Sequence, residues 1–317
     1  MKRVLTYVLI FCLIFLVGCS EKSLPPINHN QSFIASMNIL EPSMTFYDQT
    51  GEEIAQWKFD KAYTGALLIP NDRVLFYGHQ LTEADIYELS SGKHIKSIET
   101  GVGATNAYFD QEQKQFFITN SETNSVSSFD DTGTKLGECQ LGDYPMSMTS
   151  YNGLLYIINY KDTSLSVVDI DTMHLHDEWT IEGSSNGILI VPETNSVWIG
   201  GHGEGNKPNQ TVDVFDLNSG KLKDHIDVSI MPVGFSRNED EVYIINHGAN
   251  ELYATSIEGE TLWYKEIGAN PFAVATFQDF VVVAGYDDHK LYFLKDDEIM
   301  KTIDTGSGPF QLLVREV

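Results

Sequence analysis

The sequence predicts an all-β protein: a seven-bladed β-propeller, in which each blade is a sheet of four antiparallel strands. Three observations favour this fold. Short runs rich in β-branched and aromatic residues recur through residues 32–317 and end at Asn or Gly. A further strand follows most of these ends at a fixed offset of ten residues. The 286 residues of this region divide by seven into repeats of about 41, the length expected of a four-stranded blade.

Each repeat has an anchor, which we define as the residue that ends its second strand. The runs 116–120, 155–159 and 242–246 show the pattern most plainly. All seven anchors are Asn or Gly: Asn38, Gly78, Asn120, Asn159, Gly201, Asn246 and Gly285. Because these two residue types adopt positive φ most readily, we expect a left-handed residue at each anchor. Longer intervals after Gly78 and Gly201 predict insertions in the loop that follows.

Turn-forming residues separate the other strands. Asp-rich turns, such as 48–51 and 130–133, close a hairpin after the third strand, where Asp is a turn-capping side chain rather than a metal ligand. Gly-x-x-Pro turns, at 142–145, 268–271 and 306–309, precede the first strand of the next repeat. The order of turns and strands therefore repeats along the chain.

The two ends of the repeat region complement each other. The chain enters the pattern at a second strand, 33–38, so the first repeat lacks its innermost strand. It finishes at 309–314, which matches 271–276 and is a first strand without a blade of its own. We expect the N-terminal and C-terminal strands to pair in one blade, because this closes the ring and removes two exposed sheet edges.

The N-terminus predicts a targeting segment that lies outside the fold. Lys2 and Arg3 precede a mainly apolar run of 13 residues, which is too short to span a bilayer as a helix. The run ends in Leu-Val-Gly-Cys at 16–19, which resembles the lipobox of bacterial lipoproteins. The resemblance implies cleavage before Cys19 and a lipid anchor on its thiol.

Cleavage before Cys19 sets the domain plan. We expect a signal peptide over 1–18, a lipidated tether over 19–31 and the propeller over 32–317. The mature chain keeps 18 basic and 45 acidic side chains, a net charge of −27. Such a charge opposes binding to nucleic acid. The lipid anchor on Cys19 makes the cell membrane the expected partner, with the protein facing away from the cytoplasm. Cys139 has no partner left for an intramolecular disulfide.

The repeats resemble the YVTN-repeat β-propellers of the YncE-like type, which belong to a wider group with lactonase-like and quinoprotein-like propellers. The carrying features are the strand-Asn runs at Asn120, Asn159 and Asn246 and the Gly-x-x-Pro turns, and they cover about residue 32 to the end. The first, second and fifth repeats depart from the pattern. The resemblance implies the fold but no activity, because the group contains binding proteins as well as enzymes.

Propeller geometry predicts where a ligand could bind. The loop after each anchor and the Gly-x-x-Pro turns open on the same face, which we call the upper face. We call the residue after each anchor the rim residue; the seven are Ile39, His79, Ser121, Tyr160, His202, His247 and Tyr286. Aromatic and imidazole rings around a channel suit a polar or sugar-like ligand. The alternative is that rim residues are alike only because equivalent positions pack alike.

Two classes of function remain. The first is a non-enzymatic binding scaffold whose upper face takes a protein, an envelope polymer or a small molecule. The second is a lactonase-like or other propeller enzyme, a hydrolase or oxidoreductase, with its site at the channel mouth. No catalytic residue can be assigned, and we expect no cofactor and no metal site, because His79 lies across the ring from His202 and His247. The predicted ligand-binding residues are His79, Tyr160, His202, His247, Tyr286, Asn106 and Asn186.

Overall fold

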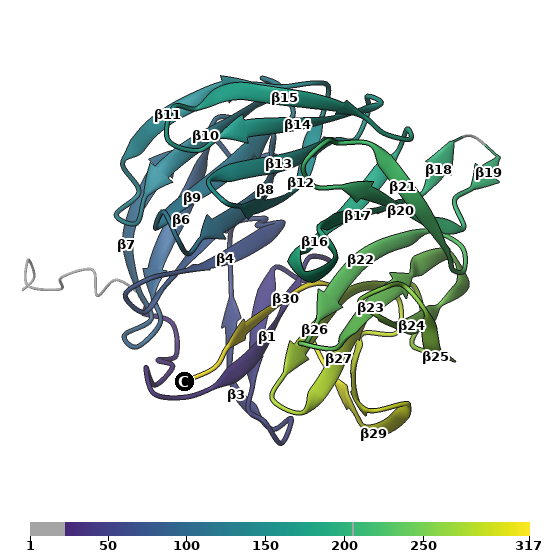
Figure 1. Ribbon diagram of the computed structural model, residues 1–317. Coiled ribbons are helices and arrows are strands. Elements are labelled where there is room, and N and C mark those ends of the chain that lie inside the picture. Colours follow the sequence, from purple (N-terminus) through teal and green to yellow (C-terminus); the bar gives the residue numbers. More distant parts are fainter. Residues whose placement is uncertain (1–22, 205) are drawn as a thin grey trace, which may run out of the picture.

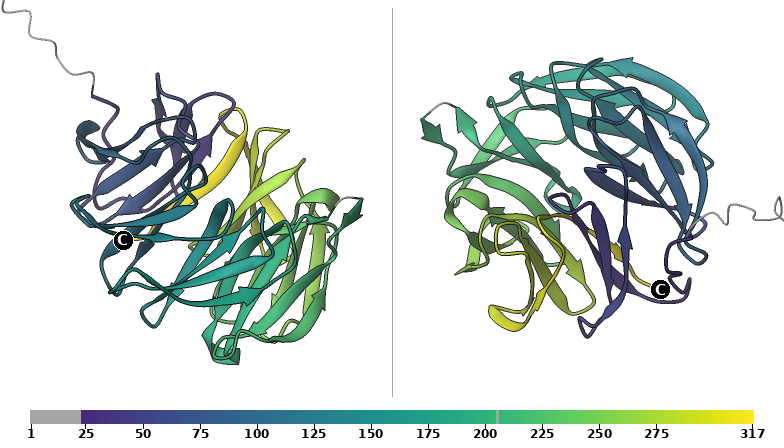
Figure 2. Two further views of the ribbon diagram at one scale, coloured as in Figure 1. Left: turned by 90° about the horizontal axis from the view of Figure 1, so that it is seen from above. Right: turned by 180° about the vertical axis from the view of Figure 1, so that it is seen from behind.

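The computed structural model describes residues 23–204 and 206–317. The predicted signal peptide over 1–18 and the predicted lipidation site Cys19 lie outside these residues. Seven four-stranded antiparallel sheets surround a central channel, and the chain passes round the ring in sequence order (Figures 1 and 2). Within the described part of the chain, no helix is long and apolar enough to cross a membrane. The predicted seven-bladed β-propeller is confirmed.

Each blade is given from its innermost strand outward. Blades 1 to 3 contain β30 (Pro309–Arg315), β1 (Phe33–Asn38), β2 (Ser43–Tyr47) and β3 (Glu53–Lys58); β4 (Gly65–Ile69), β5 (Arg73–Tyr77), β6 (Glu83–Glu88) and β7 (Lys93–Glu99); and β8 (Ala104–Asp110), β9 (Gln115–Asn120), β10 (Ser125–Asp130) and β11 (Lys135–Gln140). Blades 4 and 5 contain β12 (Pro145–Tyr151), β13 (Leu154–Asn159), β14 (Ser164–Asp169) and β15 (His174–Thr180); and β16 (Ser185–Val191), β17 (Ser196–Gly201), β20 (Thr211–Asp216) and β21 (Leu222–Asp227). Blades 6 and 7 contain β22 (Pro232–Arg237), β23 (Glu241–Asn246), β24 (Glu251–Ser256) and β25 (Thr261–Glu266); and β26 (Pro271–Phe277), β27 (Phe280–Gly285), β28 (Lys290–Lys295) and β29 (Glu298–Asp304).

Three short elements lie outside this plan. The insertion predicted after Gly201 forms a small hairpin of β18 (Gly203–Glu204) and β19 (Lys207–Pro208). Two 3-10 turns, η1 (Pro192–Thr194) and η2 (His247–Ala249), each end at an Asn in the left-handed conformation. Asn is one of the few residues with a side chain that tolerates this conformation well.

The ring is closed as the sequence predicts. Strand β30 pairs antiparallel with β1, from Phe33 opposite Arg315 to Asn38 opposite Pro309. The yellow C-terminal strand and the purple β1 lie side by side in Figure 1. Strand β30 also packs against the innermost strands of both neighbouring blades, β26 and β4. The first blade therefore combines the two ends of the repeat region.

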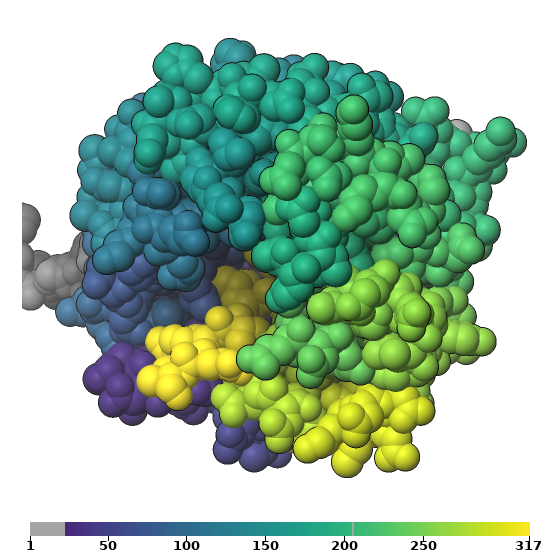
Figure 3. All heavy atoms as spheres, viewed as in Figure 1, coloured from purple at the N-terminus to yellow at the C-terminus, as the bar shows by residue number. Residues whose placement is uncertain are grey.

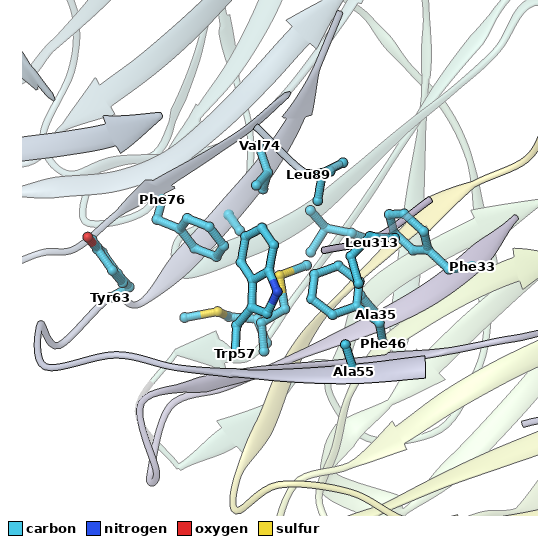
Figure 4. Packing of buried hydrophobic residues seen from close by; sticks show 14 residues of the cluster. Phe33, Ala35, Phe46, Ala55, Trp57, Tyr63, Val74, Phe76, Leu89 and Leu313 are labelled. Atoms are coloured by element: carbon cyan, nitrogen blue, oxygen red, sulfur yellow. The ribbon is translucent and has the colours of Figure 1, made fainter. Parts of the chain in front are cut away.

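Apolar side chains fill the spaces between neighbouring blades. The cluster between blades 1 and 2 shows the packing (Figure 4): Phe46 and Trp57 come from blade 1, and Val74 and Phe76 from blade 2. The ring centroids lie 5.2 Å apart for Phe46 and Trp57, and 6.1 Å apart for Trp57 and Phe76. Blade-to-blade burial of this kind makes the ring one continuous body.

The segment before β1 belongs partly to this body. We expect a tether up to residue 31, but Ile27 is fully buried in the cluster between blades 1 and 2. The Leu24 N–H donates to the Gly92 carbonyl at 2.9 Å, and the Trp57 Nε1–H donates to the Pro25 carbonyl at 2.7 Å. Residues 24–28 are therefore fixed to the propeller rather than free.

The predicted left-handed conformation of the anchors is wrong. None of the seven has a positive φ. Six of the blades instead have a positive-φ residue just before the innermost strand, at Gly103, Tyr144, Ser184, Met231, Asn270 and Gly308. Asn159 is a fully buried anchor. Its Nδ2 donates to the hydroxyls of Ser164 and Ser166, both at 2.9 Å, which explains why an Asn is tolerated there. Gly201 is Gly because a Cβ there would lie 2.8 Å from the Ser184 carbonyl oxygen.

Candidate functional site

The rim residues are held by the turns between blades. In six of the seven blades, the rim N–H donates to the carbonyl of the left-handed residue that precedes the innermost strand, at 2.8 to 3.2 Å. In blade 2 the His79 N–H donates instead to the Thr64 hydroxyl, at 3.2 Å. Since the same backbone bond recurs around the ring, the rim side chains start from equivalent positions on the upper face.

The five predicted His and Tyr side chains lie in one continuous run of rings. Tyr144, which the sequence prediction did not include, connects His79 to Tyr160, with centroids 6.3 and 6.2 Å away. The run continues from Tyr160 to His202 at 6.0 Å, and from His202 to His247 at 5.8 Å.

Two phenylalanines carry the run into blades 7 and 1. Phe272 lies 4.3 Å from His247 and 5.5 Å from Tyr286, centroid to centroid. Phe310 lies 5.2 Å from Phe272. The rings therefore extend from blade 2 to blade 7 and, through Phe310, into blade 1. Whether they contact a ligand stays a prediction.

A central cavity of about 190 Å³ lies at the innermost strands. A hollow at the middle of the ring is visible in the space-filling view (Figure 3). Six of the seven innermost strands have a register shift near their upper ends, where extra residues bulge out of the pairing. Bulges redirect side chains. Their residues line the cavity: Thr105, Met146, Ser147, Asn186, Val233, Phe272 and Phe310.

The cavity has an apolar wall and a polar wall. Val233, Phe272 and Phe310, from blades 6, 7 and 1, form the apolar wall. The polar wall is neutral. Met146 is its one apolar residue among the described residues that line the cavity, and its polar residues are Thr64, Tyr77, Thr105, Asn106, Ser147, Asn186 and Gln311. The predicted residues Asn106 and Asn186 therefore line this cavity, whereas the five rim residues lie around it and meet it through Phe272 and Phe310.

Three carboxamides on the polar wall are oriented by backbone N–H groups. The Ala107 N–H donates to Asn106 Oδ1 at 2.8 Å, and the Gly187 N–H to Asn186 Oδ1 at 3.0 Å. The Ala66 N–H donates to the side-chain Oε1 of Gln311 at 2.9 Å. Because an N–H group can only donate, each amide oxygen must face it, and none of the three NH₂ groups donates to another group of the described residues. Each NH₂ group can therefore donate to a ligand in the cavity that these residues line.

His202 and His247 are half-buried beside this cavity. Burial lowers the pKa of His202, and the nearby His247 lowers it further. Burial also lowers the pKa of His247. Nδ1 of each ring is buried and has no hydrogen-bond partner among the described residues. Both imidazoles are therefore neutral near pH 7.

Titratable side chains also gather away from the cavity. Within residues 23–204 and 206–317, no group of three or more His, Cys, Asp or Glu side chains could hold a metal ion. The buried Asp85 meets His94 and Ser97 in blade 2, a combination that the sequence did not reveal. Both Asp85 Oδ1, at 3.1 Å, and Ser97 Oγ, at 3.3 Å, contact the same His94 Nε2. A catalytic triad needs them on opposite ring nitrogens, so this cluster stabilises the blade instead.

Tyr144, Phe272 and Phe310 belong to the site but were not predicted from the sequence. Their common feature is a place next to the proline that begins an innermost strand: Tyr144 precedes Pro145, and the two phenylalanines follow Pro271 and Pro309. Each occupies the turn or the bulge at the upper end of its blade. An aromatic residue beside this proline was the available signal.

Comparison with known proteins extends the fold assignment only. No protein-family model and no curated protein matches the sequence. A protein of unknown function from Desulfotomaculum acetoxidans has a similar structure, with a TM-score of 0.75 and 10% identity over 90% of this chain and 99% of the other. Virginiamycin B lyase from Staphylococcus aureus has a TM-score of 0.63 and 16% identity over 75% of this chain and 82% of the other. BamB from Moraxella catarrhalis has a TM-score of 0.58 and 12% identity over 83% of this chain and 81% of the other.

These likenesses identify a β-propeller protein. At 16% identity or less they show the fold alone and assign no activity. The narrower resemblance to YncE-like YVTN-repeat propellers stays a prediction.

Proposed function

We propose that this protein is a lipid-anchored binding module outside the cytoplasm, and that its ligand enters the central cavity from the upper face. The observation that carries the proposal is the set of three oriented NH₂ groups, on Asn106, Asn186 and Gln311, opposite an apolar wall. Such a site fits a group that offers oxygen acceptors on one side and an apolar surface on the other. Acetylated sugars and small carboxylates have this chemistry.

The size of the cavity limits what enters it. Drug-sized ligands occupy pockets of roughly 300 to 1,000 Å³. At about 190 Å³, this cavity holds a single small group, such as one sugar residue or the end of a polymer. The ring run from His79 to Tyr286 surrounds the entrance and offers stacking faces for whatever part of the ligand stays outside. A polymer of the cell envelope fits both features.

The proposed location rests on the sequence. The lipobox-like residues 16–19 follow a basic and apolar leader, so Cys19 is the proposed site of acylation. Acyl chains on this residue would hold the protein at the membrane, on the outer side. The net charge of −27 after cleavage disfavours nucleic acid as a partner.

Side-chain amide NMR tests the binding site. Acetate and N-acetylglucosamine are acceptor-bearing probes, and tetramethylammonium is a cation without an acceptor. We expect the chemical shifts of the NH₂ groups of Asn106, Asn186 and Gln311 to change and saturate with at least one acceptor probe and to stay unchanged with the cation. In Asn186→Asp a donor becomes a charged acceptor, and we expect affinity to fall at least about tenfold, which corresponds to 1.4 kcal/mol.

A matched control keeps the amide variant interpretable. Asn152 is exposed in the turn between β12 and β13, on the opposite face, and Asn152→Asp makes the same chemical change away from the cavity. It should bind the probes as the wild type does. Amide signals that never move with either acceptor, or equal weakening by both variants, would contradict the proposed site.

A propeller enzyme is the second candidate. The neutral imidazoles of His202 and His247 favour it, because a neutral imidazole at a cavity mouth can accept a proton from a substrate. The fold is also that of a lyase, the virginiamycin B lyase. A screen of hydrolase and oxidoreductase substrates, with and without added divalent metal, tests it. Turnover that disappears in His247→Ala would select the enzyme over the binding module.

A further inference from the structure

We infer that the outer edge of blades 2 and 3 is a membrane-contact surface that lies against an anionic lipid bilayer. This surface is defined by Lys93, Ile95 and Lys96 of β7 and by Lys135 and Leu136 of β11. The inference rests on the proposed acylation of Cys19. It adds to the anchor a specific side of the propeller that contacts the lipid.

The described chain begins at this edge. Leu24 and Ile27 donate their N–H groups to the carbonyls of Gly92 and Leu89, at 2.9 and 2.8 Å. Gly92 lies in the turn between β6 and β7, and a Cβ on it would lie 1.9 Å from the Leu24 carbonyl oxygen, so the two backbones are in direct contact. In Figure 1 the dark purple start of the described chain lies next to β7. The segment cannot slide to another blade without breaking these bonds.

The connection from this point to the lipid is short. Cys19 lies four residues before Ser23 in the sequence. Four residues span at most about 14 Å when fully extended. Acyl chains on Cys19 would therefore hold the edge of blade 2, and not the opposite side of the ring, at the bilayer.

Every outermost strand contains a bulge at the same place. The register of each shifts near its start, and the residue left unpaired there is Ile54, Ile95, Leu136, His176, Lys223, Leu262 or Met300. Ile54 packs into the cluster between blades 1 and 2. Ile95 and Leu136 point outward and are 50% and 53% exposed. The anchored edge therefore presents two large aliphatic side chains to its surroundings.

The basic residues of β7 lie beside one of these two side chains and give this strand an excess of one positive charge. Among the seven outermost strands, β7 is the one with more basic than acidic residues, with Lys93 and Lys96 against Glu99. Lys96 Nζ donates to the Gly133 carbonyl in the turn between β10 and β11 at 3.2 Å, which joins the two edges. Lys135 then precedes Leu136 on β11, where it forms an ion pair with Glu138. Aliphatic side chains flanked by Lys are typical of surfaces that lie in the headgroup region.

This geometry leaves the binding site open. The membrane-contact surface is on the outer circumference of the ring, whereas the cavity opens on the upper face at the ring centre. The acylated protein contacts the bilayer by one edge. A ligand in the aqueous layer then reaches the rim residues without displacing the propeller from the membrane.

Fluorescence quenching in vesicles tests the inference. The acylated mature chain is reconstituted into phosphatidylglycerol vesicles with brominated acyl chains, and a fluorophore is placed at Ile95→Cys, Leu136→Cys or Leu262→Cys. Leu262 is the matched control, because it occupies the same bulge position and is 51% exposed but belongs to blade 6. Cys139 is buried and burial raises the pKa of its thiol, so the chain without an added cysteine gives the labelling background.

We expect quenching at positions 95 and 136 to exceed that at 262 at least threefold. Lys93→Glu combined with Lys96→Glu should reduce the quenching at position 136. Equal quenching at the three positions, or more at 262, in a chain whose mass includes the acyl groups overturns the membrane-contact surface and leaves the anchor intact. A mature mass without acyl groups overturns the anchor itself, and the contact surface with it.

Discussion

Arg315 stabilises the closure of the ring, and Arg315→Met tests how much free energy it contributes to that closure. The residue ends β30 and reaches three separate parts of the chain. Its Nη1 lies 2.8 Å from Asp72 Oδ1, in the turn between β4 and β5 of blade 2. Its Nε donates to the Gln31 carbonyl at 3.1 Å, and its guanidinium carbon lies 4.5 Å from the Phe33 ring centroid. The methionine keeps the apolar stem and removes every polar contact.

The expected loss is about 2 to 4 kcal/mol. Hydrogen bonds to charged groups contribute roughly 1.5 to 3 kcal/mol each when buried, and a cation over an aromatic ring roughly 0.5 to 1 kcal/mol at an exposed site. The side chains of Arg315 and Asp72 are only 15% and 19% exposed, so solvent weakens the pair in part. We expect the substitution to lower the free energy needed to open the first blade locally, where β30 and β1 pair.

Hydrogen exchange measured by mass spectrometry reads this opening directly. A loss of 2 to 4 kcal/mol corresponds to exchange that is roughly 30-fold to several hundredfold faster in β30 and β1. Strand β26 is the equivalent innermost strand of blade 7 and should not change. Arg237→Met is the matched variant, because Arg237 forms a bidentate ion pair with Glu193 at 2.7 and 2.9 Å, away from the closure.

Unchanged exchange in β30 of Arg315→Met would refute this reasoning. The strand ladder alone would then hold the ring closed. Faster exchange in every blade would also refute it, since the loss would be global rather than confined to the joined ends.

Three further predictions concern buried polar groups. His247→Ala should raise the pKa of His202 toward its ordinary value in an NMR titration. Burial lowers the pKa of both histidines, so the stability that their neutral forms contribute is present above about pH 6.5 and is lost as the pH falls through the lowered values. Burial raises the pKa of Asp85, but hydrogen bonds from Lys61, Ser97 and Tyr63 outweigh it and lower the pKa. The free energy of unfolding in urea should therefore decrease below about pH 4 in the wild type and depend less on pH in Asp85→Asn. Asn159→Gly should cost about 1 to 3 kcal/mol in urea unfolding; a neutral result would contradict the stabilising role of its hydrogen bonds to Ser164 and Ser166.

The repeat period made the fold predictable from the sequence. Asn120, Asn159 and Asn246 recur after similar strands, and a one-residue error in alignment would have turned apolar faces outward. The closure followed from arithmetic, because the chain enters at a second strand and ends on an unpaired first strand. Both inferences depend on backbone periodicity, which residue types record well.

The details of the site were less predictable, because they depend on bulges and side-chain contacts. His79, Tyr160 and the other rim residues followed from their offset after the anchor. Asn106 and Asn186 were predicted and line the cavity. The rest of the cavity walls was not predicted, since a bulge at Phe272 or Thr105 changes the direction of one side chain without a distinctive residue type. The position of Ile27 in the core was also missed, because one apolar residue in a polar segment carries no periodic signal.

A crystal structure of the protein purified from its own membrane, with its natural ligand retained, tests the central claim most directly. The account predicts electron density in the central cavity, with acceptor oxygens within about 3.2 Å of the side-chain nitrogens of Asn106, Asn186 and Gln311. Ligand density on the lower face or the outer circumference, with only water in the cavity, would contradict it.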